Sequence, residues 1–208
     1  AALKLAKSPG PDGFTSLFYK SFSTTLVPYL TKAFNNFRSE GAVSPSMCEA
    51  TIALIPKPGK DQRLCASYRP IALLNIDSKL YSKVLATHLA EVLPDLVSPD
   101  KSGFVHRRQT HDNLRRLLHL MEKARLKSVP TLVVALDAEK AFVRVDWGFL
   151  RKTLLRANLG PTFVKMVFAN YQCPTSRISL NGRLSAPFRI HRGTRQGCPL
   201  SRFFLPSL

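Results

Sequence analysis

The run Thr131–Leu136, with the letters TLVVAL, constrains the fold more than any other segment of this sequence. It is short, apolar and β-branched in its middle, so it predicts a buried strand with neighbouring strands on both sides. Asp137 follows directly. A carboxylate at the exit of a buried strand either ends the strand and begins a turn, or holds a metal ion or serves as a base in a fixed position. The residue alone is compatible with both interpretations.

Apolar residues at helical spacing predict helices on both sides of this strand. Gly41 is expected to end the second of them, because glycine readily adopts the left-handed conformation of a helix C-terminus. The predicted helices cover residues 14–22, 26–37, 80 to about Pro94, 110–127, and a segment from an Asp146 cap to about Ala157.

Two of these helices have a defined apolar face. The first repeats apolar positions every four residues, at Leu80, Val84, His88 and Val92, with Leu85 and Leu89 beside them. His88 on this stripe is expected in or beside the core rather than as a metal ligand. The second carries Leu114, Leu117, Leu118 and Met121, with Met121 as core filler.

Strands account for the remaining regular structure. Residues 50–56 and 71–74 are short apolar runs separated by a Pro/Gly/Lys turn. The pair Asn181-Gly182, between alternating apolar residues of the segment 176–190, predicts a β-hairpin. Helices mixed with a few strands predict an α+β architecture.

The charge balance indicates the kind of partner. Lys and Arg total 31 against 13 Asp and Glu, a formal net charge of +18. Such an excess disfavours a compact chain by self-repulsion unless a polyanion is nearby. Nucleic acid is the predicted partner and an anionic membrane surface the alternative, but no run is long enough to span a bilayer. The four cysteines lack zinc-ligand spacing, so no structural zinc is expected.

Two cationic clusters are candidate binding sites. Lys57, Lys60 and Arg69 surround a predicted strand–turn–strand unit. They either grip a triphosphate or nucleic-acid backbone, or form a solvated charged turn. The segment Arg192–Ser201 holds two glycines among polar and cationic residues. It is typical either of a backbone that approaches a ligand closely or of an ordinary polar loop.

Six segments together resemble one known family. In chain order they are SPGPDGFT (8–15), LIPKPGKD (54–61), SYRPIALLNIDSKLYSKVLA (67–86), SGFVHRRQTHDN (102–113), ALDAEKAFVRVDW (135–147) and RGTRQGCPLS (192–201). This series closely resembles the reverse transcriptase of non-LTR (LINE-like) retrotransposons. The likeness extends from residue 8 to residue 201, and six segments in the family's order make chance a poor explanation.

The resemblance implies a right-hand polymerase, with a fingers-like region over 1–128 and a partial palm over 129–208. It implies that Asp137 holds catalytic Mg²⁺, that Phe142 screens the sugar 2′ position, and that Gln196 and Gly197 touch the incoming nucleotide and template. Lys57, Lys60 and Arg69 match the fingers' triphosphate contacts. The implied partners are an RNA template, a DNA primer or RNA–DNA hybrid, and deoxynucleoside triphosphates, without a membrane. The family also implies action in the nucleus.

The sequence departs from the family pattern in the palm. The family adds an aromatic-Ala-Asp-Asp segment after RQGCPLS, whereas here Asp146 is the last acidic residue. Val143 stands where the family usually has an aspartate, and the sequence after Ser201 drifts from the expected continuation. These departures predict a C-terminally truncated domain with an incomplete palm sheet, inactive as this chain.

Three readings remain open for the chain itself. It is a fragment of a polymerase, a non-catalytic basic remnant that binds RNA or DNA, or a transposon relic that folds poorly. An incomplete sheet further predicts weak stability and an exposed apolar patch near Val133, Ala135 and Phe203–Leu205.

Overall fold

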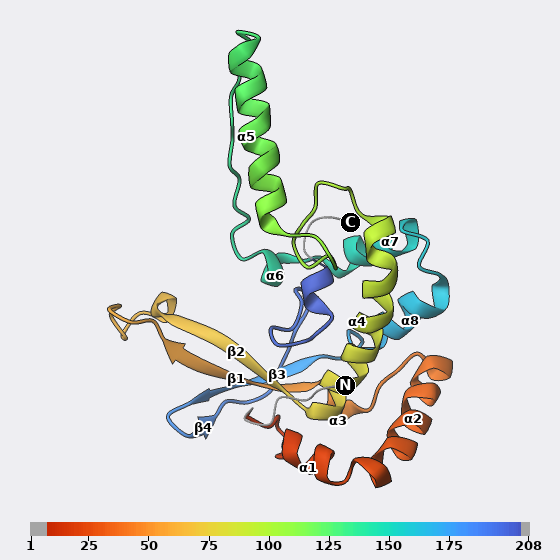
Figure 1. Ribbon diagram of the computed structural model, residues 1–208. Coiled ribbons are helices and arrows are strands. Elements are labelled where there is room, and N and C mark those ends of the chain that lie inside the picture. The colour runs from red at the N-terminus through yellow and green to blue at the C-terminus, as the bar shows by residue number, and fades with distance from the viewer. Residues whose placement is uncertain (1–7, 205–208) are drawn as a thin grey trace.

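The computed structural model describes residues 8–204, with helices and one small sheet interleaved along the chain (Figure 1). In chain order the elements are α1 (Ser16–Ser21), α2 (Ser23–Glu40), α3 (Pro45–Cys48), β1 (Glu49–Pro56), η1 (Cys65–Ser67), β2 (Tyr68–Leu74), α4 (Ile76–Leu96), α5 (Thr110–Leu126), α6 (Ala141–Arg144), α7 (Trp147–Arg156), α8 (Pro161–Ala169), β3 (Thr175–Leu180), β4 (Arg183–Leu184), β5 (Phe188–Arg189) and η2 (Ser201–Phe203). The predicted α+β class is confirmed.

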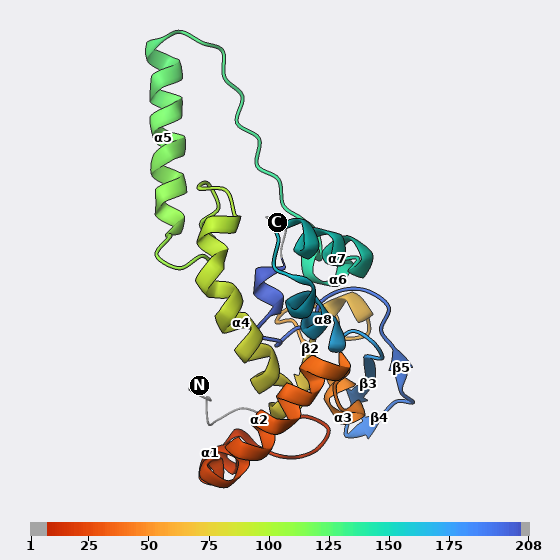
Figure 2. The same cartoon turned by 90° about the vertical axis from the view of Figure 1, so that its right-hand side faces the viewer.

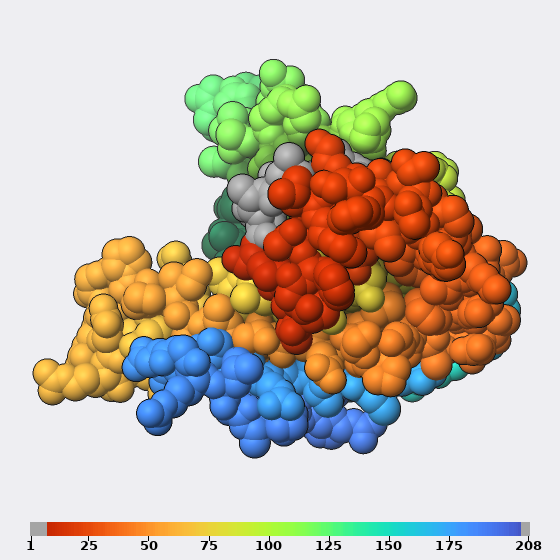
Figure 3. Space-filling view, turned by 90° about the horizontal axis from the view of Figure 1, so that it is seen from below, coloured from red at the N-terminus to blue at the C-terminus, as the bar shows by residue number. Residues whose placement is uncertain are grey.

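The sheet joins segments that lie far apart in the sequence. Its order is β2-β1-β3-β4, and β5 also pairs with β3. β1 runs antiparallel to β2, with Ile55 opposite Arg69, and parallel to β3, with Glu49 opposite Thr175. Seen from below, the β1–β2 hairpin extends away from the helices, and the β3–β4 region lies beside it (Figure 3). The predicted strands at 50–56 and 71–74 are confirmed within β1 and β2.

The predicted hairpin at Asn181-Gly182 is confirmed. Both residues have positive φ, 49° and 75°, as a two-residue turn between right-twisted strands requires. The turn sets the register Leu180 opposite Arg183 and Ser179 opposite Leu184. The second strand of the hairpin, β4, has only two residues and ends at Leu184. The chain pairs with β3 again at β5.

The core is built around α4, with α2, α7 and α8 packed near it (Figure 2). Its buried stripe is Tyr81, Leu85, Leu89 and Leu93. The predicted face is confirmed at Leu85 and Leu89 and wrong at Val84 and Val92, which are each 43% exposed. His88 is also exposed. Two neighbouring rows of this helix are largely apolar, one through Val84 and Val92 and the other, one residue later, through Leu85 and Leu89. Only the packing of the other helices determines which row is buried.

The helix also continues two residues past Pro94, to Leu96. A proline inside a helix lacks the N–H of the i→i−4 hydrogen bond, and its ring crowds the carbonyl of residue i−4. The helix accordingly ends within one turn of Pro94, near the predicted end. Arg108 further stabilises this end of the helix. Its guanidinium donates to the carbonyl oxygens of Pro94, Ser98 and Lys101 at 2.8, 2.6 and 2.9 Å.

The N-terminal helices α1 and α2 confirm the predicted helical segments. α2 ends at Gly41, whose φ of 76° closes the helix in the left-handed conformation. The rings of Phe34 and Phe37 lie 5.2 and 5.7 Å from the ring of Tyr81. Tyr81 donates to the carbonyl oxygen of Met166 at 3.1 Å, so α2, α4 and α8 meet at one aromatic cluster.

α5 confirms the predicted helix but not its burial. No residue of α5 is buried, and the helix stands away from the body in both side views (Figures 1 and 2). Met121 is 48% exposed, so its predicted place in the core was wrong. The spacing correctly indicated an amphipathic helix, but no described element packs against its apolar face.

The predicted strand Thr131–Leu136 is absent from the described structure, where this segment is extended and unpaired. Leu132 and Leu136 are 85% and 92% exposed. Within the described sheet β1 is paired on both sides, by β2 and β3, while the outer edge of β2 has no partner. The segment nevertheless pairs with none of the described strands, so its strong β propensity is not realised there.

The predicted apolar patch is confirmed in one part and wrong in another. Val133 and Ala135 are exposed. Phe203 and Phe204 are buried, at 2% and 6% exposure, because η2 turns them into the core. Leu205 lies outside the described residues.

Candidate nucleotide and nucleic-acid site

The loop after β5 is hydrogen-bonded to α6 and the start of α7. The Thr194 N–H donates to the carbonyl oxygen of Phe142, and the Gly193 N–H to that of Val145, both at 2.7 Å. The Trp147 indole N–H donates to the carbonyl oxygen of Gly193 at 2.8 Å. Two segments that are fifty residues apart, each carrying residues predicted to contact the nucleotide, therefore meet at one junction.

This junction lies over one face of the sheet. Between them is a cavity of about 200 Å³. It is lined by Ile52, Pro70 and Ala72 from the sheet, and by Val143, Arg192 and Gln196 among others from the junction. A Cβ atom on Gly197 would lie 3.2 Å from the carbonyl oxygen of Ala72, and the φ of Gly197 is 94°. Glycine at 197 therefore suits both the turn and the close approach to β2.

Phe142, Gln196 and Gly197 are thus brought together through the Thr194–Phe142 hydrogen bond. Gln196 and Gly197 are exposed, and Phe142 is 36% exposed. A turn whose neighbouring backbone is fixed by hydrogen bonds while its own residues are exposed to solvent can contact a ligand without rearranging first.

The cations of the β1–β2 hairpin do not line this cavity. Lys57 stabilises its own loop: its ammonium group donates to the carbonyl oxygen of Ala66 at 2.7 Å, and its backbone N–H donates to the carbonyl oxygen of Ser67 at 2.8 Å. Lys60 and Arg69 are exposed. Side chains alternate between the faces of a strand, so Arg69 lies on the face opposite to Pro70 and Ala72. The structure does not place Arg69 on the cavity's side of the sheet.

Asp137 is exposed at the end of the extended segment that precedes α6. Its neighbour Glu139 pairs instead with Arg144 and Lys140, at 2.8 and 3.7 Å. Residues 8–204 contain no group of three or more His, Cys, Asp or Glu that could hold a metal ion. One carboxylate of the kind that Mg²⁺ prefers is present, but the described residues do not complete a magnesium site around it.

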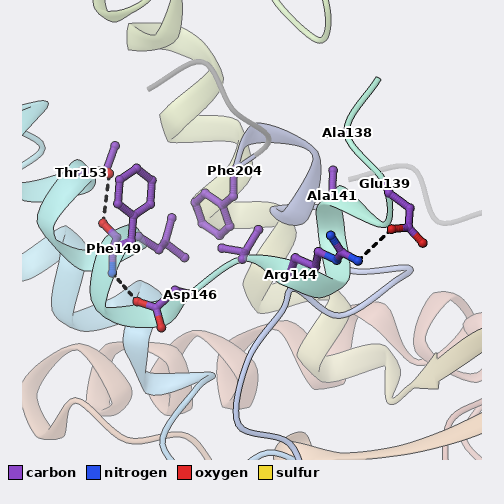
Figure 4. Close-up of a pocket in the computed structure, with 10 residues that line it drawn as sticks. Ala138, Glu139, Ala141, Arg144, Asp146, Phe149, Thr153 and Phe204 are labelled. Carbon is purple, nitrogen blue, oxygen red and sulfur yellow. Dashed lines mark hydrogen bonds and ion pairs between the residues drawn. The ribbon is translucent and has the colours of Figure 1, made fainter. Parts of the chain in front are cut away.

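A second cavity, of about 430 Å³, lies next to this segment (Figure 4). Its wall is mostly apolar, with Phe149, Leu150 and Phe204 among the lining residues. Asp146 lies at its rim and caps α7 by accepting from the Phe149 N–H at 2.7 Å, as the sequence predicted. Figure 4 also shows the Glu139–Arg144 ion pair at the opposite rim. Both carboxylates near Asp137 along the chain are therefore engaged elsewhere.

Comparison with known proteins identifies the family. Residues 55–205 match the family described as reverse transcriptase (RNA-dependent DNA polymerase). The chain belongs to this reverse transcriptase family. Among its relatives, the Transposon TX1 uncharacterized 149 kDa protein of Xenopus laevis is 37% identical over 195 residues, which cover 94% of this chain and 15% of that protein.

Two further relatives belong to transposable elements, and their similarity places this chain among the reverse transcriptase sequences of non-LTR retrotransposons. The probable RNA-directed DNA polymerase from transposon BS of Drosophila melanogaster is 31% identical, over 69% of this chain and 16% of that protein. The Retrovirus-related Pol polyprotein from type-1 retrotransposable element R2 of Nasonia vitripennis is 26% identical, over 92% of this chain and 18% of that protein. The chain thus spans less than a fifth of the length of each of these three relatives.

One residue that holds this loop was not predicted to do so. Arg195 lies in the segment Arg192–Ser201, whose cations were predicted either to contact a ligand or to belong to an ordinary polar loop, and no contact within the fold was predicted for it. Its position between two glycines was the only available signal. In the part of the chain that the structure describes, no helix is long and apolar enough to cross a membrane.

Proposed function

We propose that this chain is part of an RNA-directed DNA polymerase of a non-LTR retrotransposon. Its partners are an RNA template, a DNA primer or RNA–DNA hybrid, and deoxynucleoside triphosphates. The observation that carries the proposal is the Thr194–Phe142 hydrogen bond of 2.7 Å. It joins the two segments that a polymerase needs together, one beside the sugar and one beside the base. The family match supports this assignment.

In this proposal Phe142 screens the sugar 2′ position, and a bulky ring there rejects a 2′-hydroxyl by steric clash. Gln196 and Gly197 contact the nucleotide and template from the exposed turn. Lys57, Lys60 and Arg69 supply triphosphate contacts from the β1–β2 hairpin. Because Arg69 lies on the far face of the sheet from the cavity, that contact requires the triphosphate to reach around the hairpin or the hairpin to bend.

The division of the chain follows the same proposal. Residues 1–128 form a fingers-like region and residues 129–208 part of a palm. The projecting β1–β2 hairpin supports the first assignment (Figure 3). The sheet nevertheless crosses the boundary, because β3 pairs with β1, so the two regions share a structural element.

Metal binding limits what this chain does alone. We propose that Asp137 holds Mg²⁺ in the complete polymerase. Two-metal phosphoryl transfer requires ions about 3.5–4 Å apart, held by acids from more than one segment. Among residues 8–204 no group of three or more His, Cys, Asp or Glu that could hold a metal ion surrounds Asp137. The chain alone is therefore expected to bind hybrid without extending a primer.

The test combines binding with extension. The chain is mixed with an RNA template annealed to a DNA primer, Mg²⁺ and the four deoxynucleoside triphosphates. We expect salt-sensitive binding and no primer extension. Extension that disappears in Asp137→Ala would show that the site is complete after all. Absence of binding at low salt would reject the polymerase assignment for this chain.

The charge of +18 favours one alternative, a non-catalytic basic remnant that binds RNA or DNA. The two functions differ in their response to nucleotide. A polymerase fragment binds the hybrid more tightly when the deoxynucleotide complementary to the next template base is added, whereas a basic remnant does not. In the polymerase reading, Phe142→Ala reduces the preference for deoxynucleotide over ribonucleotide in this assay.

A further inference from the structure

The guanidinium of Arg195 connects three parts of the fold. It donates to the carbonyl oxygens of Met47 and Cys48 at 2.9 and 2.7 Å, where α3 ends and β1 begins. It also donates to the carbonyl oxygen of Asn170 at 3.4 Å, and Asn170 is the C-terminal cap of α8. All three acceptors are backbone atoms, so the contact depends on the fold rather than on particular side chains.

These contacts suit arginine in particular. The last carbonyl groups of a helix lack intrahelical donors and need partners from elsewhere. The planar guanidinium presents several donors in fixed directions, which allows one side chain to reach two neighbouring carbonyls and a third beyond them. A lysine ammonium group has a single nitrogen and cannot span the same set.

The backbone of Arg195 begins the turn that exposes Gln196 and Gly197. Its carbonyl oxygen accepts from the Cys198 N–H at 3.0 Å and from the Ser201 hydroxyl at 2.9 Å. Gln196 and Gly197 are therefore the two central residues of a β-turn. The positive φ of Gly197, 94°, fits a turn type that requires glycine at that position.

The side chain and the backbone of Arg195 thus make different contacts. Its half-buried side chain is held by α3, β1 and α8, while its backbone closes an exposed turn one residue later. Gly193 and Thr194, which directly precede Arg195, are hydrogen-bonded to the carbonyl oxygens of Val145 and Phe142. The start of the turn is therefore held to α6 by its backbone and to the beginning of β1 by the Arg195 side chain.

We infer that Arg195 is a positioning residue, which holds the Gln196-Gly197 turn in the place where it contacts a nucleotide. That the turn meets a nucleotide rests on the proposed function, whereas the contacts that hold the turn do not. Arg195 itself touches neither nucleotide nor template, since its donors face protein carbonyl groups.

The experiment compares Arg195→Ala and Arg195→Lys with Arg183→Ala. Arg183 is an exposed arginine in β4, so its variant loses the same charge without the contacts. Two measurements are made on the whole chain. One is amide hydrogen exchange of the peptide that contains residues 196–198. The other is binding of poly(rA)·oligo(dT) hybrid with and without dTTP, after circular dichroism has shown that each variant is folded.

Charged hydrogen bonds of this kind predict exchange at 196–198 about tenfold or more faster in Arg195→Ala, and a loss of about tenfold or more in the dTTP-dependent gain of affinity. In Arg183→Ala, hybrid binding without dTTP stays within about twofold of wild type, since that variant loses one charge of many. Arg195→Lys is expected to lie between wild type and alanine in both readouts.

Two outcomes would overturn the inference. One is a lower melting temperature in Arg195→Ala with unchanged exchange at 196–198, which would make Arg195 a general brace of the fold. The other is equal effects in Arg195→Ala and Arg183→Ala. If Arg195→Ala does not fold, the same criteria apply to Arg195→Lys. If dTTP adds nothing in wild type, the proposed function fails, while faster exchange confined to 196–198 still supports the positioning role.

Discussion

A Cβ atom on Gly193 would lie 2.7 Å from the carbonyl oxygen of Val143. Real side chains essentially never approach backbone so closely, and the φ of Gly193 is 83°. Glycine at 193 therefore serves a specific contact: it lets the loop after β5 lie directly on the segment that carries Phe142. The Gly193 N–H then reaches the carbonyl oxygen of Val145 at 2.7 Å.

Gly193→Ala should separate these two segments. Gly182→Ala is the matched control, because Gly182 also has a positive φ of 75° but no atom within 4 Å of the added Cβ. The backbone strain common to both variants is about 1–3 kcal/mol. Gly193→Ala should lose at least about 1 kcal/mol more, since its neighbour is backbone that must move. Urea unfolding of both variants measures the difference, and equal losses would contradict the close contact.

Much of the fold was predictable because its signals are local. The Asn181-Gly182 turn, the Asp146 cap and the Gly41 helix end each depend on residues within a few positions, and each was found where the sequence placed it. The candidate loops were predictable for a related reason, since their segments keep the order and spacing of the family.

The remaining features depend on partners far away in the sequence. Of the predicted apolar face of α4, Leu85 and Leu89 are buried whereas Val84 and Val92 are exposed, because other helices select the buried row. The strand expected at 131–136 did not form, and the segment pairs with no described strand although the outer edge of β2 is free in the described sheet. The role of Arg195 depends on Met47 and Asn170, which no local pattern connects to it.

Asp146→Ala should destabilise the start of α7. The Asp146 carboxylate accepts from the Phe149 N–H at 2.7 Å, and loss of an N-cap acceptor costs about 0.5–2 kcal/mol. Asp146→Asn keeps an acceptor oxygen and should lose much less. Thermal or urea unfolding compares the two. Equal destabilisation by alanine and asparagine would mean that charge, rather than capping, is the contribution of Asp146.

Asp77 should make stability depend on pH in the direction opposite to an ordinary salt-bridged aspartate. Burial raises the pKa of Asp77 above its ordinary value of 3.8, and the nearby Asp12 raises it further. As pH rises through 3.8, the unfolded chain loses this proton first, so the folded state is progressively destabilised until pH exceeds the raised folded pKa.

Asp77→Asn removes this effect. Its free energy of unfolding should therefore increase relative to wild type as pH rises across that interval, and the difference should be constant above it. Asp95→Asn, on the exposed side of the same helix, is the control. Urea unfolding at a series of pH values measures both. A difference that is flat with pH would show that the two states bind this proton equally.

The cysteines should differ in their rates of reaction with a maleimide. Cys65 and Cys173 are exposed, while Cys48 is buried. Burial also raises the pKa of the Cys48 thiol, and the thiolate is the reactive form. Cys48 should therefore be labelled last in the native chain and as readily as the others in urea. Mass spectrometry of digests taken over time gives the order. Early labelling of Cys48 would contradict the burial of its side chain at the end of α3.

Leucine truncations test whether the 131–136 segment contributes to the core. Leu136 is 92% exposed, whereas Leu154 in α7 is 0% exposed. Leu154→Ala should cost about 2–5 kcal/mol, since it empties a packed site, and Leu136→Ala should stay within about 0.5 kcal/mol of wild type. Urea unfolding of the whole chain distinguishes them, because the same deletion is made in both. A large loss in Leu136→Ala would mean that TLVVAL is packed as the strand its sequence predicts, and that Asp137 is held at a rigid strand end rather than on an extended exposed segment.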